Sequence, residues 1–398
     1  MEFSANLLDF AEMLACAVDL MERGSHHHGQ RVAYIAFRLF EKIKPGYNPS
    51  DLVIASYLHD IGIESFRTKE KARQFHLDKE ILWPHCRDGA EMVEMVDLLK
   101  DIKPFIFYHH TDYSEIQAGL VEVPLEAQII HLADRIEVQI RPHKMVLEQV
   151  EGIVNTILKH RASMFNPELV DAFLDLSVQE SFWLDIVNEY QSVVEHIYFP
   201  SMDINMNSND IRQFSHLCAK IVDRKSPFTA QHSQRVASIA VRLAEFCGMT
   251  GQDLFFMEIA GLLHDLGKLA IPETILHKQG RLTDEEYRVI KQHSYYTYCL
   301  IDRLNVMDDV RDWAAFHHER LDGSGYPFHL TAGELHLGAR VMAVADMVGA
   351  ITEDRPYREG YGEKETMGIM WEQVRNNRID GDVVEVLGRY YGEIVYGR

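Results

Sequence analysis

The chain carries the same pattern of histidines and aspartates twice. HGQRVA from His28 matches HSQRVA from His232, and HDIG from His59 matches HDLG from His264. Further residues recur in the same order: His85 with His293, His109-His110 with His317-His318, Asp134 with Asp346, and Arg141-Pro142 with Arg355-Pro356. Such internal repetition indicates repeated structural units. The chain is therefore expected to fold into two copies of one domain.

The spacing of apolar residues indicates the fold class. Residues 235–246 have the three-and-four spacing of a helix with one buried face, and residues 339–351 form a second apolar helix. Thr283 and Glu286 have the spacing of a capping box, which would open a helix that carries His293. Few stretches alternate apolar and polar residues for long enough to form a sheet. We predict an all-α protein made of two tandem helical bundles.

A polar stretch separates the two copies. Residues 200–209 begin with a proline and are rich in asparagine, which is typical of a linker. We expect an N-terminal domain in residues 1–199 and a C-terminal domain in residues 210–398. A chain of 398 residues that is 46% hydrophobic can supply both domains with a core.

Adjacent histidines at His317 and His318 indicate a metal site in the C-terminal copy, because one ion satisfies several buried imidazoles at once. The candidate ligands are His232, His264, Asp265, His293, His317, His318 and Asp346. Seven donors suit two ions, with Asp265 as the natural bridging ligand. Imidazole and carboxylate ligands without thiolate favour iron, with manganese as the alternative, over zinc or nickel. Two ions about 3.5 to 4 Å apart promote phosphoryl displacement, so we predict phosphodiester hydrolysis.

From about Asp210 to its C-terminus, the chain resembles the HD-GYP family of HD phosphohydrolases, which linearise cyclic dinucleotides. The resemblance rests on PFTAQHSQRVA, HDLGKLAIPETILHKQGRLTDEE, KQH, HHERLDGSGYP, ARVMAVADM and DRPYR. It implies two metal sets that share one aspartate: His232, His264, Asp265 and Asp346, and Asp265, His293, His317 and His318. It also implies that Lys268 lies beside the scissile phosphate, that Arg355 and Arg358 bind phosphates, and that Gly325 and Tyr326 belong to a loop that shapes the pocket.

The sequence departs from the family pattern at two positions. Some members hold a third metal through a glutamate four residues before the first histidine, where this chain has Phe228. Because phenylalanine cannot bind a metal, we expect a two-metal centre. Many relatives have an aspartate three residues after the metal-binding one, where this chain has Gly349. Any role of that aspartate in ordering the pocket is in doubt, and the metal set stays intact.

The N-terminal copy retains a second set of candidate ligands: His28, His59, Asp60, His85, His109, His110 and Asp134. Ile63 replaces the equivalent of Lys268, and TDYSEIQAG follows His110 in place of the GYP loop. Two interpretations stay open. The copy is either a metal-binding domain with its own hydrolase activity, for example on a linear product, or a regulatory or dimerising domain with relic ligands.

Charge and cysteine content limit the partners and the compartment. A formal net charge of -21 disfavours long nucleic acid and anionic membranes. The five cysteines show no CxxC spacing, which fits free thiols in the cytoplasm. The N-terminal segment lacks the basic start of a signal peptide, and no apolar run reaches the ~18 residues of a membrane span. We also expect a homodimer.

The resemblance implies cyclic di-GMP as the substrate, although tandem arrangements of this kind also resemble enzymes acting on 3′,3′ cyclic GMP-AMP. We expect a metal-bridging hydroxide to attack phosphorus, with Asp265 binding both ions and Lys268 stabilising the developing charge. One alternative is a sensor that binds a cyclic dinucleotide without cutting it, which the intact ligands and Lys268 argue against. Another is a broader HD nucleotide phosphohydrolase, which the GYP loop argues against.

Overall fold

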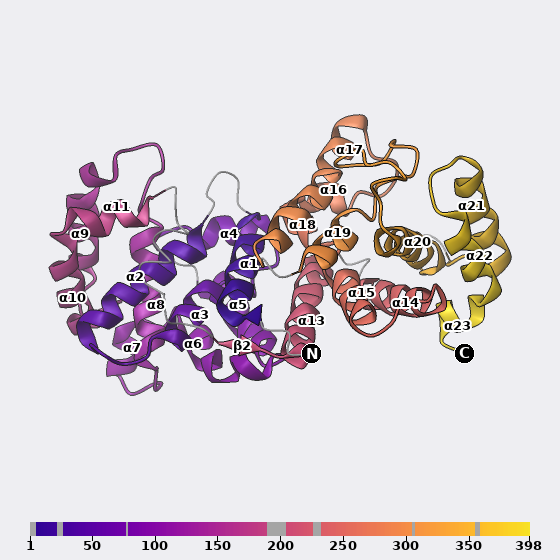
Figure 1. The fold of residues 1–398 in the computed structure, drawn as a ribbon. Coiled ribbons are helices and arrows are strands. Elements are labelled where there is room, and N and C mark those ends of the chain that lie inside the picture. Colours follow the sequence, from indigo (N-terminus) through magenta and orange to yellow (C-terminus); the bar gives the residue numbers. More distant parts are fainter. Residues whose placement is uncertain are drawn as a thin grey trace. The chain divides into compact units, whose positions relative to one another are not determined.

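The computed structural model describes residues 5–21, 27–76, 79–188, 204–225, 232–304, 307–354 and 359–398. Over these residues the regular secondary structure is helical apart from one pair of two-residue strands, which confirms the all-α prediction (Figure 1). The chain divides into two compact units, Met1–Gln213 and Phe214–Arg398. No helix in the described ranges is both long and apolar enough to cross a bilayer.

The N-terminal unit contains a helical bundle and the strand pair. Its elements are β1 (Ala5–Asn6), α1 (Leu7–Asp19), α2 (His28–Ile43), α3 (Ser50–Leu58), α4 (Phe66–Ala72), α5 (Lys79–Val93), η1 (Asp97–Ile102), α6 (Lys103–Tyr108), α7 (Tyr113–Gln117), α8 (Leu125–Glu137), η2 (Val146–Glu148), α9 (Val150–Lys159), α10 (Pro167–Ser177), α11 (Glu180–Ile186) and β2 (Asn205–Met206). The strands are antiparallel, with Ala5 opposite Met206. Strand β2 lies in the stretch predicted as a linker, and the N-terminal unit extends past that stretch to Gln213.

The C-terminal unit is a second helical bundle. Its elements are α13 (Ser208–Lys225), which begins just before the division between the units, α14 (His232–Phe246), α15 (Gln252–Leu263), η3 (Leu266–Ala270), α16 (Glu273–Leu276), α17 (Asp284–Ile290), α18 (Gln292–Asp302), α19 (Asp308–Ala315), α20 (Leu337–Thr352), α21 (Glu363–Arg375), α22 (Gly381–Arg389) and α23 (Tyr391–Tyr396).

The two units pack corresponding helices in the same way. Helix α14 packs against α15 and α20, and α2 packs against α3 and α8. The buried face of α14 consists of the apolar residues whose spacing predicted it. The capping box at Thr283 is also present and opens α17. The prediction was wrong in one respect, because α17 ends at Ile290 and His293 lies on the next helix, α18.

Candidate metal centres

The C-terminal unit brings its seven candidate ligands together from separate elements. His232 starts α14, His264 caps the end of α15 with Asp265 next to it, His293 lies on α18, His317 and His318 follow α19, and Asp346 lies on α20. All are buried except His318, which is half-buried.

The ligand atoms form two groups. In the first group, Asp346 Oδ1 lies 3.5 Å from His232 Nε2 and 3.7 Å from His264 Nε2. In the second group, His293 Nε2 lies 3.3 Å from His317 Nε2. The first group offers two imidazole nitrogens and a carboxylate oxygen, the second offers imidazole nitrogens, and the atoms of each group lie close enough together to share one ion.

Asp265 lies between the two groups. Its Oδ2 is 3.3 Å from His264 Nε2 in the first group, and its Oδ1 is 3.7 Å from His293 Nε2 in the second. His318 belongs to the second group with His293 and His317. One carboxylate therefore presents an oxygen to each group, which is the arrangement that a bridging ligand requires.

Backbone carbonyls orient three of the imidazoles. In each case the Nδ1 atom contacts the carbonyl three residues earlier: His264 with Gly261 (2.7 Å), His293 with Ile290 (2.7 Å) and His317 with Ala314 (2.6 Å). This contact fixes the ring so that Nε2 is available to a metal. His264 Nε2 and Asp265 Oδ1 are buried without a hydrogen-bond partner in the described part of the chain. Because such atoms are costly unless they bind something, the donor set fits metal ions.

Close backbone approach explains the glycine that follows the His-Asp pair. A Cβ atom on Gly267 would lie 2.0 Å from the carbonyl oxygen of His293, and one on Gly62 would lie 2.0 Å from that of His85. Only a residue without a side chain lets the chain pass this close to the histidine-bearing helix. The glycine thus brings Asp265 within reach of His293.

The GYP loop is held by a carboxylate that the sequence did not identify. Glu319 Oε1 accepts hydrogen bonds from the backbone N–H groups of Phe328 (2.7 Å) and His329 (3.1 Å), and Oε2 accepts one from Leu330 (3.1 Å). Gly325 lies so close to this residue that a Cβ atom would be 2.4 Å from Glu319 Cα. The predicted role of Gly325 in a tight loop has this physical basis.

A pocket of about 380 Å³ borders the centre and is lined in part by His318, Tyr326, Asp346 and Arg378. The rings of Tyr326 and His318 lie with their centroids 4.8 Å apart. Lys268 Nζ lies 2.5 Å from Asp265 Oδ2, beside the proposed bridge. The predicted phosphate-binding residues Arg355 and Arg358, and Phe228, lie outside the described residues.

The N-terminal unit repeats the arrangement around Asp60. Its Oδ1 lies 3.5 Å from both His59 Nε2 and His85 Nε2. His28 Nε2 lies 3.6 Å from Asp60 Oδ2 and 3.6 Å from Asp134 Oδ1. These five candidate ligands therefore cluster together, and His109 and His110 join His85 in a neighbouring group.

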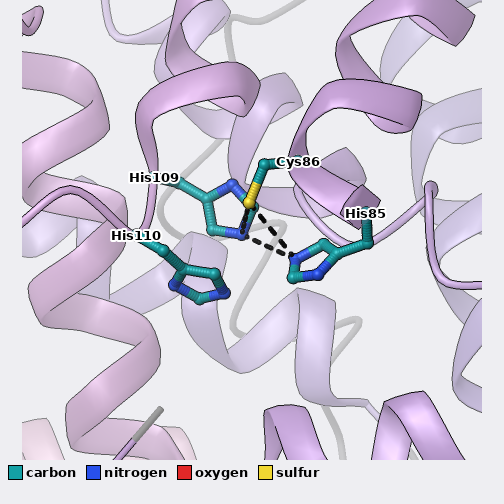
Figure 2. A group of neighbouring side chains, drawn as sticks. All are labelled: His85, Cys86, His109 and His110. Carbon is teal, nitrogen blue, oxygen red and sulfur yellow. Dashed lines mark hydrogen bonds between the residues drawn. The ribbon is translucent and has the colours of Figure 1, made fainter. Parts of the chain in front are cut away.

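A cysteine joins the second half of this N-terminal centre (Figure 2). His85, Cys86, His109 and His110 place their nitrogen and sulfur atoms within 4.8 Å of one another, and all four are buried. Burial raises the pKa of the Cys86 thiol, so the thiol is protonated at neutral pH without a metal. From the sequence, Cys86 is expected only to be one of five free thiols, although its position next to the predicted ligand His85 is a usable signal.

Comparisons with known proteins identify the family of this chain. Two HD-domain family models match residues 26–139 and 216–383. The 3′3′-cGAMP-specific phosphodiesterase 1 of Vibrio cholerae is 31% identical, and the match covers 98% of this chain and 92% of that protein. The chain belongs to the HD-GYP family.

Two further proteins resemble this HD-GYP chain. A cyclic di-GMP phosphodiesterase of Pseudomonas aeruginosa is 40% identical, and the match covers 36% of this chain and 35% of that protein. The crystal structure of a cyclic GMP-AMP specific phosphodiesterase of Vibrio cholerae matches 98% of both chains with a TM-score of 0.70 and 22% identity. This similarity shows that the two chains share a fold.

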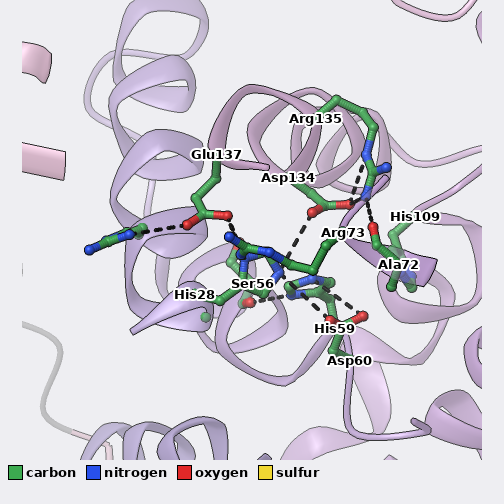
Figure 3. Close-up of polar contacts among 12 residues, drawn as sticks. His28, Ser56, His59, Asp60, Ala72, Arg73, His109, Asp134, Arg135 and Glu137 are labelled. Atoms are coloured by element: carbon green, nitrogen blue, oxygen red, sulfur yellow. Dashed lines mark hydrogen bonds and ion pairs between the residues drawn. The ribbon is translucent and has the colours of Figure 1, made fainter. Parts of the chain in front are cut away.

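Buried basic side chains distinguish the N-terminal HD domain from the HD-GYP domain. Ile63 does replace the equivalent of Lys268, but Lys69 on α4 places its Nζ 2.9 Å from Asp60 Oδ2. Arg135 Nη2 lies 2.5 Å from Asp134 Oδ2 (Figure 3). Sequence comparison missed both residues because neither has a basic counterpart at the matching position of the C-terminal copy.

The carboxylate that contacts the first histidine differs between the two domains. In the N-terminal domain, Glu137 Oε2 lies 2.7 Å from His28 Nδ1, and Glu137 is three residues after the metal-site aspartate (Figure 3). Gly349 occupies that position in the HD-GYP domain. There Glu353, one helical turn later, places Oε2 3.3 Å from His232 Nδ1, within ion-pair distance although not aligned as a hydrogen bond. Glu353 thus supplies the carboxylate that Gly349 lacks.

The pKa values of several candidate ligands suit metal binding. Burial, followed by the nearby His318, lowers the pKa of His293 to about 3, and burial lowers the pKa of His318 and His85 to about 4. These imidazoles are therefore neutral at pH 7, which is the form that binds a metal. Burial alone would raise the pKa of Asp265, but His264 and Lys268 lower it well below its ordinary value. Asp265 is thus an anion across the physiological range.

Proposed function

We propose that the HD-GYP domain hydrolyses a cyclic dinucleotide to a linear dinucleotide with two divalent metal ions. The observation that carries this proposal is the position of Asp265, which directs one oxygen to each of two ligand groups. We favour iron and regard manganese as the alternative, because the donors are imidazoles and carboxylates. There are two substrate candidates. The relative that matches 98% of this chain is named for 3′3′-cGAMP, and a relative that matches 36% of this chain is named for cyclic di-GMP.

Separate residues of the chain would stabilise charge, shape the pocket and bind the substrate's phosphates. When bound, the two ions supply Lewis acidity, which polarises phosphoryl oxygens and acidifies water. Lys268 holds a positive charge next to Asp265 and is placed to stabilise negative charge on the phosphate. Tyr326 borders the pocket, and Glu319 fixes the loop that carries it. Arg355 and Arg358 would bind the substrate's phosphates.

Product analysis with a matched pair of variants tests the proposal. The full chain, loaded anaerobically with iron, is incubated with each cyclic dinucleotide, and the products are identified by chromatography. The wild type should yield a linear dinucleotide, and H264A/D265A should abolish its formation. H59A/D60A removes the corresponding pair of the N-terminal domain and should preserve the reaction. Undiminished turnover in H264A/D265A, with its helical circular dichroism retained, would refute the assignment.

The same incubation separates the alternative functions. A sensor would bind a cyclic dinucleotide at equilibrium and return it intact, whereas a broader phosphohydrolase would act equally on linear nucleotides or RNA ends. A cytoplasmic homodimer stays a prediction, which light scattering of the purified chain and cell fractionation would test.

A further inference from the structure

We propose that the N-terminal HD domain binds a single zinc ion through His85, Cys86, His109 and His110, as a closed structural site. This site would differ from the two-metal centre of the HD-GYP domain in its ligands, its metal and its purpose. It goes beyond the proposed hydrolysis and does not depend on it.

The distances between the ligand atoms match a tetrahedral zinc site. His85 Nε2 lies 3.2 Å from His109 Nε2, and Cys86 Sγ lies 3.7 Å from His85 Nε2 and 4.0 Å from His109 Nε2. Zinc bonds of about 2.0–2.1 Å to nitrogen and about 2.3 Å to sulfur place tetrahedral ligands about 3.3–3.4 Å apart for two nitrogens and about 3.6 Å apart for nitrogen and sulfur. The three separations differ from that geometry by at most about 0.4 Å, and a ligand nitrogen of His110 lies within 4.8 Å of the same atoms. Figure 2 shows the four side chains gathered between the helices that carry them.

The fourth side chain supplies independent evidence for a ligand. Both ring nitrogens of His110 are buried without a hydrogen-bond partner in the described part of the chain. The His110 ring lies with its centroid 4.0 Å from that of His109 and 5.1 Å from that of His85. A buried imidazole with neither nitrogen satisfied is unfavourable unless it binds a ligand. A metal shared with the neighbouring imidazoles removes that cost.

The charge around the other half of the centre argues for one ion. Four carboxylates and four basic side chains meet there: Asp19, Asp60, Asp134 and Glu137 with Lys69, Arg135, Arg73 and Arg31. The corresponding carboxylates of the HD-GYP domain are Asp265, Asp346 and Glu353. Among the described residues, Lys268 is the only lysine or arginine that forms an ion pair with any of them. The N-terminal carboxylates are therefore already neutralised by protein cations, and a second metal would have to displace them.

The residue at the position of Cys86 separates the chemistry of the two domains. Ser294 stands next to His293 in the HD-GYP domain, as Cys86 stands next to His85, and its Oγ lies 3.3 Å from His293 Nε2. A thiolate is a soft ligand that selects zinc over manganese or magnesium, whereas a hydroxyl is not. On binding, the Cys86 thiol releases its proton to solvent and the sulfur bonds to zinc. Four protein ligands leave no open position, which is the pattern of structural zinc sites.

Cobalt substitution of the full chain tests the site directly. A thiolate bound to Co²⁺ gives a sulfur-to-metal charge-transfer band in the near ultraviolet, and imidazole and carboxylate ligands do not. The wild type should show this band, and Cys86→Ser should lose it. Cys218→Ser is the matched control, because Cys218 is also buried but belongs to no candidate metal group of the described residues, and it should keep the band. A wild type without the band, or a Cys86→Ser variant that keeps it, would overturn the proposal.

A second measurement on the unmodified chain covers the case in which Cys86→Ser fails to fold. X-ray absorption at the zinc edge of zinc-loaded wild type should show a sulfur neighbour at about 2.3 Å. A shell of nitrogen and oxygen alone would contradict the site. H264A/D265A should retain this zinc–sulfur signal while it loses hydrolysis, so the zinc site and the proposed catalytic centre can fail independently.

Discussion

Replacing Gly267 with alanine tests whether the close approach of η3 to α18 sets the geometry of the catalytic centre. The added Cβ atom would lie 2.0 Å from His293 O, whereas ordinary contact begins at 3.4 Å, so the two segments must separate by about 1.4 Å. A displacement of about 1 Å can cost ~10²-fold in turnover. We expect Gly267→Ala to lower hydrolysis about 100-fold and stability by about 1–3 kcal/mol, because Asp265 and His293 lie on opposite sides of this contact.

The assay compares initial rates of linear dinucleotide formation at saturating manganese, together with bound metal and thermal unfolding. Gly62→Ala is the matched control, since its Cβ atom would lie 2.0 Å from His85 O in the N-terminal domain. It should cause a similar overpacking but preserve hydrolysis. If Gly267→Ala keeps its rate within a few-fold of the wild type, the reasoning is wrong. An equal loss of hydrolysis in Gly267→Ala and Gly62→Ala would show that the effect comes from general destabilisation of the protein.

Three further predictions follow from individual contacts. Glu353→Gln should weaken manganese binding by about 10–100-fold in calorimetric titration, because His232 loses its carboxylate partner, while Glu393→Gln at an exposed site should not. Lys69→Met should lower the free energy of unfolding of the N-terminal domain by about 3–5 kcal/mol in urea, since it leaves buried carboxylates without their cation. Burial lowers the pKa of Lys225 to about 7 in the folded protein. Above pH 7 the Lys225 amine is therefore mostly neutral in the folded state but still protonated in the unfolded state. Stability should therefore rise between pH 7 and 10 by up to about 1.4 kcal/mol per unit, and Lys225→Met should flatten that rise.

The candidate ligands could be identified from the sequence because each of them occurs at a matching position in both copies of the repeat. A histidine that recurs at matching places in two copies, such as His85 and His293, must serve a structure common to both. Adjacent histidines such as His317 and His318 add a chemical constraint, because buried imidazoles need partners. These local signals do not depend on knowing which helices pack together. The structure brings all fourteen candidate residues into two clusters, and their role as metal ligands stays a prediction.

The residues that could not be found from the sequence contact the two centres from other helices or from helix ends. Lys69 reaches Asp60 from α4, and Glu353 reaches His232 from the end of α20. Nothing in the pattern of a polar helix tells which of its lysines turns inward. The predicted helix from Thr283 to His293 was wrong because it is interrupted at Lys291, which ends α17 and precedes α18.

The two domains differ in charge more than in ligand geometry, and charge decides how many ions each can hold. A pair of unit charges 4 Å apart is worth about 4 kcal/mol at an effective dielectric constant of about 20. Arg135 and Lys69 lie closer than that to Asp134 and Asp60, so an incoming dication must first replace interactions of at least this size. In the HD-GYP domain Lys268 pairs with Asp265, but Asp346 is paired only with histidines among the described residues. Metal binding at Asp346 therefore exchanges a weak partner for a strong one. The same scaffold can therefore hold a two-metal hydrolytic centre in one copy and a single structural ion in the other.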